Sequence, residues 1–222
     1  MAGRVDQVRA IVREDGVGSL FKRAWSWIVT RVHDSGEIIW LVSDRDTNQD
    51  AGGEFTIEEV VTPEQHRRCD TLRPLDPEVQ RLRESAGGQR WTILDAEGEV
   101  NFICWTFRDE AIIVEKPAHK LPLPENTFQL EDSYVPRARR KSRASVVAVE
   151  LLSLELLRQY EIDSLQLITK IDVENVAAYK ALMNGGWRVF ARATGTRWFS
   201  RFTRWSVDYE DASVFPDLGR LV

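Results

Sequence analysis

Hydrophobic and polar positions alternate along this chain with two different periods, and each change of period marks the end of an expected element. Apolar residues recur every three or four positions in helical segments, and every second position or in short runs in strands. The helical segments are 5–14, 18–32, a stretch after Thr62, about 76–85, 144–160 and 176–184. The strand segments are 37–42, 55–61, 90–94, 100–107, 127–135, 164–171, 187–193 and 201–207. The sequence therefore predicts an α/β fold in which helices and strands alternate about a mixed sheet.

Local signals fix several boundaries between these elements. Thr62 is placed to cap a helix, with Pro63 at its first position and Gln65 completing a capping box. Residues 95–98, Asp-Ala-Glu-Gly, have the composition of a hairpin turn between the strands on either side. Residues 115–126 contain three prolines, so we expect an irregular loop there.

A polar stretch at 45–54, which includes Gly52-Gly53, reads as a linker and divides the chain. We expect an N-terminal helix-helix-strand extension over 1–54, a main domain over 55–207 and a C-terminal tail over 208–222. The amphipathic segment 18–32 carries basic residues on its polar side, which suits packing against the fold, a partner subunit or a membrane surface. Of these, packing against the fold or a partner is the commoner use.

Composition narrows the classes of protein that the chain can represent. The formal net charge is −5, which argues against a nucleic-acid-binding surface over the whole domain. Two cysteines are too few for a disulfide scaffold, and Cys104 lies inside an apolar strand, as a reduced core thiol does. No apolar run approaches the ~20 residues of a membrane helix. These features predict a cytoplasmic protein without stable membrane insertion.

The segment from Tyr134 to Ser145 is the most informative part of the sequence. A strand ends at Pro136, five of the seven residues 137–143 are Lys or Arg, and an apolar helix begins directly afterwards. Positive side chains beside the unpaired N–H groups of a helix start can bind an anion such as a diphosphate. The cluster has no interleaved aromatic residues, which argues against a nucleic-acid patch; a solvated basic loop is the other alternative.

A second segment follows the strand at 164–171. Asn175 stands three residues before Ala178 and eleven before Gly186-Trp187, with an apolar helix in between. Together, the two segments resemble the signature motifs of the GNAT family, the acetyl-CoA-dependent N-acyltransferases. In the first segment, Arg139 stands at the initial position of the family motif, which is Gln or Arg, and Ala144 stands at the last position, which is Gly or Ala. Ser142 stands where the family has a central glycine, which is a departure from the motif.

The resemblance implies a GNAT-like fold, a mixed and largely antiparallel sheet flanked by helices, that uses acetyl-CoA as co-substrate. It implies that the pyrophosphate lies at the basic turn, that the pantetheine arm runs along the preceding strand, and that Asn175 contacts the arm region. The residues expected to contact coenzyme A are Tyr134, Val135, Arg139, Arg140, Lys141, Ser142, Arg143, Ala144, Ser145 and Asn175.

Acyl transfer to an amine needs a base for the ammonium proton and a donor for the departing thiolate. Glu131 and Asp132 precede the basic turn on the strand that carries the base in the family, and neighbouring strand residues point to opposite faces. We expect Asp132 to be the base, with Glu131 second. The family's usual donor is a tyrosine seven residues after the Asn, where this chain has Leu182; Tyr179, one turn earlier, is the remaining candidate.

These observations favour an N-acyltransferase that transfers an acetyl group to a primary amine by direct attack in a ternary complex. Leu182 and Ser142 favour an alternative, a degenerate GNAT-like protein that binds acyl-CoA for sensing or scaffolding. A related transferase of aminoacyl groups or of longer acyl chains also stays open. The acceptor is a small-molecule or peptide amine whose identity the sequence does not give, and a homodimer is compatible with the chain. His66 and Cys69 alone do not make a metal site, so no metal is predicted.

Overall fold

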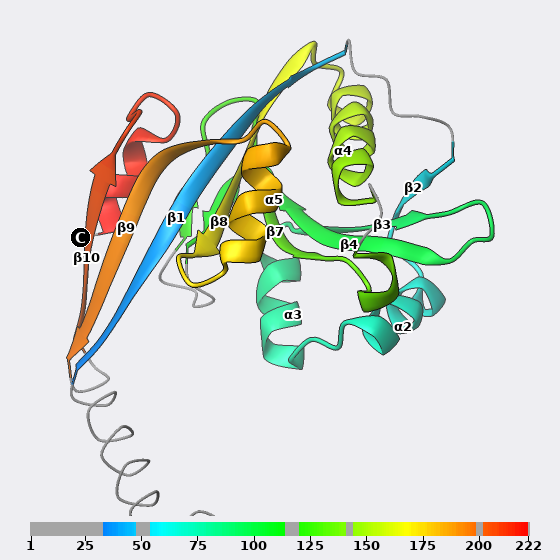
Figure 1. The fold of residues 1–222 in the computed structure, drawn as a ribbon, viewed down its shortest axis with the longest axis horizontal. Coiled ribbons are helices and arrows are strands. Elements are labelled where there is room, and N and C mark those ends of the chain that lie inside the picture. The colour runs from blue at the N-terminus through cyan, green and yellow to red at the C-terminus, as the bar shows by residue number, and fades with distance from the viewer. Residues whose placement is uncertain (1–32, 48–53, 114–119, 141–143, 199–201, 222) are drawn as a thin grey trace, which may run out of the picture.

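The computed structural model of the chain describes residues 33–47, 54–113, 120–140, 144–198 and 202–221. They form an eight-stranded sheet in the order β10-β9-β1-β8-β7-β4-β3-β2, and a separate two-stranded sheet, β5-β6 (Figure 1). The strands are β1 (His33–Asp46), β2 (Thr56–Glu59), β3 (Gln89–Leu94), β4 (Val100–Phe107), β5 (Glu110–Ile112), β6 (Lys120–Pro122), β7 (Thr127–Tyr134), β8 (Ser164–Asp172), β9 (Arg188–Trp198) and β10 (Phe202–Tyr209). The helices are α2 (Pro63–Leu72), α3 (Pro77–Ser85), α4 (Ala144–Tyr160) and α5 (Val176–Asn184), with 3-10 helices η1 (Arg137–Arg139) and η2 (Pro216–Leu221).

Within the large sheet, every neighbouring pair of strands is antiparallel except β7 and β8, which are parallel. The predicted mixed and largely antiparallel sheet, flanked by helices, is therefore confirmed. Within the described ranges, no helix is both long enough and apolar enough to cross a membrane. The helices predicted at 5–14 and 18–32 lie outside the described residues.

The capping signals were read correctly. The Thr62 side chain accepts a hydrogen bond from the Gln65 backbone N–H, and the Gln65 side chain accepts one from the Thr62 backbone N–H. Pro63 is the first residue of α2, and the predicted helix at 76–85 is found as α3 with Asp76 as its N-cap. The loop predicted over 115–126 is wrong in one part, because β6 lies within it and pairs with β5. Pro122 is tolerated there because β6 is an edge strand that pairs on one side.

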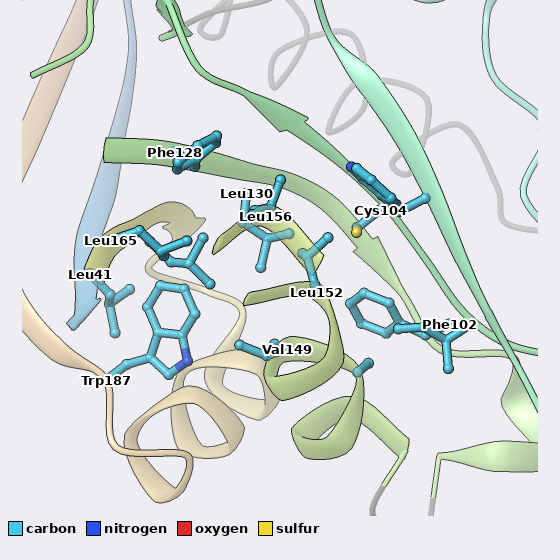
Figure 2. Packing of buried hydrophobic residues seen from close by; sticks show 14 of the residues in the cluster. Leu41, Phe102, Cys104, Phe128, Leu130, Val149, Leu152, Leu156, Leu165 and Trp187 are labelled. Atoms are coloured by element: carbon cyan, nitrogen blue, oxygen red, sulfur yellow. The ribbon is translucent and has the colours of Figure 1, made fainter. Parts of the chain in front are cut away.

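The two faces of the sheet carry different cores. Along β4, Phe102 and Cys104 point to one face and Ile103, between them, points to the other. On the first face α4 packs against the sheet. Figure 2 shows this cluster, whose labelled members are Leu41, Phe102, Cys104, Phe128, Leu130, Val149, Leu152, Leu156, Leu165 and Trp187. On the second face α2 contributes Cys69, and Leu75 and Ala86, which flank α3, pack near Trp105.

The strand predicted at 37–42 lies in the middle of the sheet. It forms part of β1, which pairs with β8 on one side and with β9 on the other. Its Leu41 packs into the α4 core, and Trp40 packs with Phe215, just before η2, on the second face. Both side chains are fully buried. Beyond the end of β8, strands β1, β9 and β10 continue as a three-stranded extension, seen at the lower left of Figure 1.

Candidate functional site

The parallel strands β7 and β8 begin side by side and then diverge. They are paired only from Thr127 to Leu130 on β7 and from Gln166 to Thr169 on β8, although both strands continue further. At the point of divergence, the Thr169 hydroxyl donates a 2.8 Å hydrogen bond to the Leu130 carbonyl oxygen. Past this bond, the facing backbone edges of the two strands are no longer paired with each other. A wedge-shaped opening therefore forms within the sheet.

A bulge in β7 lies beside this opening. The pairing between β4 and β7 jumps from Trp105 opposite Glu131 to Ile103 opposite Tyr134, which leaves Asp132 and Ser133 outside the regular register. Asp132 has a φ of 49°, in the left-handed region that Asp adopts more readily than most residues. A bulge of this kind bends a strand and redirects its side chains. It places Glu131 and Asp132 in different surroundings.

A cavity of about 400 Å³ occupies the opening. It is bounded by the diverging strands, by α4 and α5 on one face, and by Arg73 at the end of α2, which belongs to the other face. The cavity thus reaches both layers of the fold. Its lining consists of Arg45, Arg73, Phe102, Leu130, Asp132, Ser133, Val135, Ser145, Val146, Val149, Thr169, Lys170, Ile171, Asp172, Asn175, Ala178, Ala181, Leu182, Gly185 and Trp187.

The start of α4 opens onto this cavity. The helix has 17 residues, begins at Ala144 and has no acidic residue in its first turn, so the positive end of its dipole is not neutralised by its own side chains. Ser145 and Val146 of that turn line the cavity. A helix start with these features is able to bind an anion.

The basic turn before α4 is described up to Arg140, and Lys141, Ser142 and Arg143 lie outside the described residues. Arg139, in η1, forms a 3.0 Å ion pair with Asp95 of the β3–β4 turn. The Arg140 Nε donates to the Val135 carbonyl oxygen at 3.3 Å. Hydrogen bonds from Asn101 and the backbone, together with Arg139, lower the pKa of Asp95 below its ordinary value. The hairpin turn therefore helps to hold the basic turn in place.

Val135 and Asn175 line the cavity, whereas Tyr134 packs on the second face. The Asn175 side chain accepts a hydrogen bond from the Ala178 backbone N–H at 3.2 Å, so it caps α5 as expected. Leu182 also lines the cavity. Tyr179 is half-buried against the α4 core and is not among the lining residues.

Asp132 is held by two arginines that sequence reasoning did not single out. Its Oδ1 accepts a hydrogen bond from Arg73 Nη2 at 2.7 Å, and its Oδ2 accepts one from Arg83 Nη1 at 2.9 Å. The Arg83 side chain is only 5% exposed, whereas that of Arg73 is 45% exposed and its guanidinium lies over the Tyr134 ring. Asp132 is therefore a fixed carboxylate at the edge of the cavity, with one buried and one accessible guanidinium beside it.

Glu131 has a different set of partners. It forms an ion pair with Lys170 of β8 and accepts a 2.6 Å hydrogen bond from Gln129 Nε2. Lys170 also donates to the Ile112 carbonyl oxygen. Asp132 lines the cavity and Glu131 does not. The two candidate bases therefore lie in separate polar networks, and the bulge between them is the cause.

Arg45 is a further cavity residue that no sequence pattern indicated. Its Nη2 donates to the Gly185 carbonyl oxygen at 3.5 Å. Burial lowers the pKa of its guanidinium, and the Glu150 carboxylate opposes that shift. Its Nε is buried without a hydrogen-bond partner within the described residues. Arg45 therefore adds positive charge to the end of the cavity formed by Gly185 and Trp187.

Neither cysteine is suited to act as a nucleophile in this cavity. Cys69 and Cys104 are both free and buried, and burial is the main cause of the raised pKa of each thiol. A thiol with a raised pKa forms little of the reactive thiolate. Among the described residues, no group of three or more His, Cys, Asp or Glu side chains is arranged to hold a metal ion.

No protein-family model matches the chain, and neither does any curated protein. Solved structures of similar fold include an acetyltransferase of the GNAT family from Novosphingobium aromaticivorans (9% identity, TM-score 0.40, 73% of this chain and 63% of that chain). Another is a GCN5-related N-acetyltransferase from Sphaerobacter thermophilus (10% identity, TM-score 0.47, 79% of this chain and 56% of that chain). A third is an aminoglycoside 6'-N-acetyltransferase from Acinetobacter baumannii (13% identity, TM-score 0.40, 60% of this chain and 89% of that chain).

The chain spans less than two thirds of the length of the first two of these structures. At such identities the likeness concerns the fold alone. The mixed, largely antiparallel sheet flanked by helices that the sequence predicts is present in the structure itself.

Proposed function

We propose that the protein is an N-acyltransferase that moves an acyl group, most simply acetyl, from coenzyme A to a primary amine. The observation that carries this proposal is the divergence of β7 and β8 directly beside the start of α4. The divergence supplies two unpaired backbone edges, and the helix start supplies N–H donors and a positive dipole end. Coenzyme A has the matching parts, because its extended arm contains amides and its pyrophosphate is anionic.

In this proposal the pyrophosphate binds at the α4 start and the basic turn, with Arg139, Arg140, Lys141, Ser142, Arg143, Ala144 and Ser145 around it. The pantetheine arm lies along the β7 backbone at Tyr134 and Val135, between α4 and α5, and Asn175 is at its side. The apolar cavity residues Val149 and Leu182 would border the arm. The thioester would then lie near Leu130 and Thr169, where the two strands separate.

The reaction would proceed by direct attack. The amine nitrogen forms a bond to the thioester carbonyl carbon, the carbon–sulfur bond breaks, and the amine proton passes to a base while the thiolate takes up a proton. We propose Asp132 as the base because it lines the cavity, with Glu131 second. Tyr179 remains the candidate donor to the thiolate; a coenzyme A thiol also leaves readily near neutral pH, because its pKa lies near the usual thiol value of about 8.5.

A second function is favoured by a specific observation. Both oxygens of Asp132 accept hydrogen bonds from arginines, and Glu131 is paired with Lys170, so each candidate base is engaged in an ion pair. Leu182, which cannot donate a proton, lines the cavity at the family's tyrosine position. A protein that binds acyl-CoA without turning it over would have these features.

Thiol release with a panel of primary amines, combined with calorimetric binding of acetyl-CoA, separates the two functions. We expect acetyl-CoA to bind and at least one amine to release thiol. Asp132→Asn should lower turnover about a hundredfold or more, because loss of a general base typically costs 10²–10⁴ in rate, with little change in acetyl-CoA affinity. Glu131→Gln tests the second candidate, and a loss of turnover in that variant instead would make Glu131 the base. If acetyl-CoA binds but no amine releases thiol, the binding function is the better account.

The compartment and the partners follow from the same proposal. We propose a cytoplasmic protein, because its two free thiols are buried and its donor is a cytoplasmic metabolite of the acyl-CoA class. The acceptor would be a small molecule or a peptide. Nucleic-acid binding is not expected, and a homodimer stays an open prediction.

A further inference from the structure

Arg73 and Asp132 form a pair of opposite charges at the edge of the cavity. The two side chains are joined by the 2.7 Å hydrogen bond between Arg73 Nη2 and Asp132 Oδ1, and both line the cavity. Arg83 binds the other carboxylate oxygen from a buried position. Asp132 therefore has a buried guanidinium on one side and an accessible guanidinium on the other.

Arg73 is available for a second anion. Its side chain is 45% exposed, and its guanidinium lies over the Tyr134 ring. The distance from the guanidinium carbon to the ring centroid is 5.7 Å. A guanidinium has five N–H donors in a fixed planar arrangement, so it can keep its bond to Asp132 and bind a carboxylate as well. The stacking and the Asp132 bond hold the guanidinium in one orientation in advance, which lowers the entropy lost on binding.

The position of Arg73 in the fold places its guanidinium on the side from which the acceptor enters. Arg73 is the C-cap residue of α2, on the face of the sheet opposite to α4 and α5. In the proposed function, coenzyme A occupies the α4–α5 side of the cavity, so the acceptor enters from the side of α2 and α3. Arg73 therefore meets the acceptor before Asp132 takes its proton.

We propose that the acceptor is an amine with a neighbouring carboxylate, such as the α-amino group of an amino acid. Its ammonium group would face Asp132 and its carboxylate would bind Arg73, so that the charges of the acceptor are the reverse of those of the pair. This inference deepens the proposed function and rests on it. Arg73 is then a residue that determines specificity, and Arg83 positions Asp132.

The experiment compares amino acids with the corresponding amino acid amides as acceptors. An amide keeps the amine and the side chain but lacks the negative charge, and rates are compared per unprotonated amine because the two amines differ in pKa. We expect kcat/KM to be tenfold to a hundredfold higher for the amino acids, the usual range for a charge-assisted hydrogen bond of about 1.5–3 kcal/mol. Arg73→Gln should abolish this preference and leave the affinity for acetyl-CoA unchanged.

Two variants make the comparison specific. Arg67→Gln removes an exposed arginine from the same helix and should leave the preference intact. Arg73→Lys keeps the charge but not the planar donor pair, so it should retain part of the preference. If Arg73→Gln disturbs Asp132 instead, both classes of acceptor will lose rate equally. Equal rates for acids and amides in the unaltered protein, or a preference that survives Arg73→Gln, would overturn the inference.

A separate measurement tests the inference if the protein does not catalyse acyl transfer. If no acceptor releases thiol, calorimetry with protein saturated with coenzyme A measures binding of the same amino acids and amides. The inference predicts binding of the acid that depends on Arg73, with little binding of the amide. Absence of that binding would refute it even without catalysis. Turnover that favours the amides would refute it and leave the acyltransferase proposal standing.

Discussion

Strand β8 has two edges that are used in opposite ways. Along one edge it pairs with β1 over its whole length, from Ser164 to Asp172. Along the other it pairs with β7 only from Gln166 to Thr169, and the residues after Thr169 line the cavity. The fully paired edge fixes β8 in the sheet while the other edge stays open past Thr169. A sheet can therefore expose one edge of a strand to a ligand if pairing along the other edge of that strand supplies its stability.

The two edges also differ in what covers them. Near the β1 edge lie fully buried apolar side chains, among them Trp40, Leu41 and Phe190. Near the open edge lie charged and polar groups, among them Asp132, Lys170 and Asn175. We expect mutations at the first edge to change the free energy of unfolding and mutations at the second to change ligand binding.

The largest effect is expected at the paired edge. Leu41→Ala removes a fully buried side chain from the α4 core and should lower the free energy of unfolding by about 2–5 kcal/mol, the usual range for this change. Urea denaturation measures it. Val173→Ala, at a position that is 39% exposed, is the control and should change stability by less than about 0.5 kcal/mol. A small loss for Leu41→Ala would contradict the structural role assigned to β1.

The next effect is expected at the open edge. Changing Arg139 and Arg140 together to Ala should weaken coenzyme A binding by about 1.5–3 kcal/mol for each charge-assisted hydrogen bond lost. Binding should also become less sensitive to salt. Calorimetry measures both, and Arg158→Ala, an exposed arginine near the far end of α4, is the matched control. An unchanged dissociation constant would argue against a pyrophosphate at the basic turn.

The smallest effect is expected at the point where the edges separate. Thr169→Val keeps the shape of the side chain but removes the hydroxyl that donates to the Leu130 carbonyl oxygen. We expect the free energy of unfolding to fall by about 0.5–1.5 kcal/mol, the net value of one hydrogen bond. Acetyl-CoA affinity, measured in parallel, should fall only slightly. A large loss of affinity without loss of stability would show that Thr169 contacts the ligand directly.

Much of the fold could be predicted because its signals are local. The capping box at Thr62, the hairpin turn at 95–98 and the Asn175 cap each depend on residues within a few positions of one another. Side-chain and backbone groups so close in sequence meet in almost any tertiary arrangement. The start of α4 was likewise found from the change of composition after Pro136.

The position of β1 could not be predicted in this way. Residues 37–42 have the pattern of a strand, but nothing in that pattern indicates pairing with β8, more than a hundred residues later. The stretch at 45–54 reads as a linker because it is polar, although β1 continues through Arg45 to Asp46. The end of a long strand can be polar where it leaves the core, and composition alone does not distinguish such a strand end from a linker.

The arginine contacts of the site were missed for a similar reason. Arg73 and Arg83 reach Asp132 across 59 and 49 positions of sequence, and each lies in or beside a helix that looks like an ordinary solvated one. The bulge that turns Asp132 toward them depends on the pairing of β7 with β4, which no single-strand pattern contains. An acidic residue on the strand could be predicted, but its partners could not.

The place of β1 in the sheet also has a consequence for the order in which the molecule can be assembled. Strand β1 is synthesised before β8 and β9, the two strands between which it lies. Until β8 has left the ribosome, β1 has neither of its neighbours, and one of its hydrogen-bonding edges stays exposed until β9 follows. Pairings of such long sequence separation form slowly, and exposed edges invite association with other chains. We therefore expect folding of the nascent chain to be completed late, with the side of the sheet that contains β9 and β10 forming last.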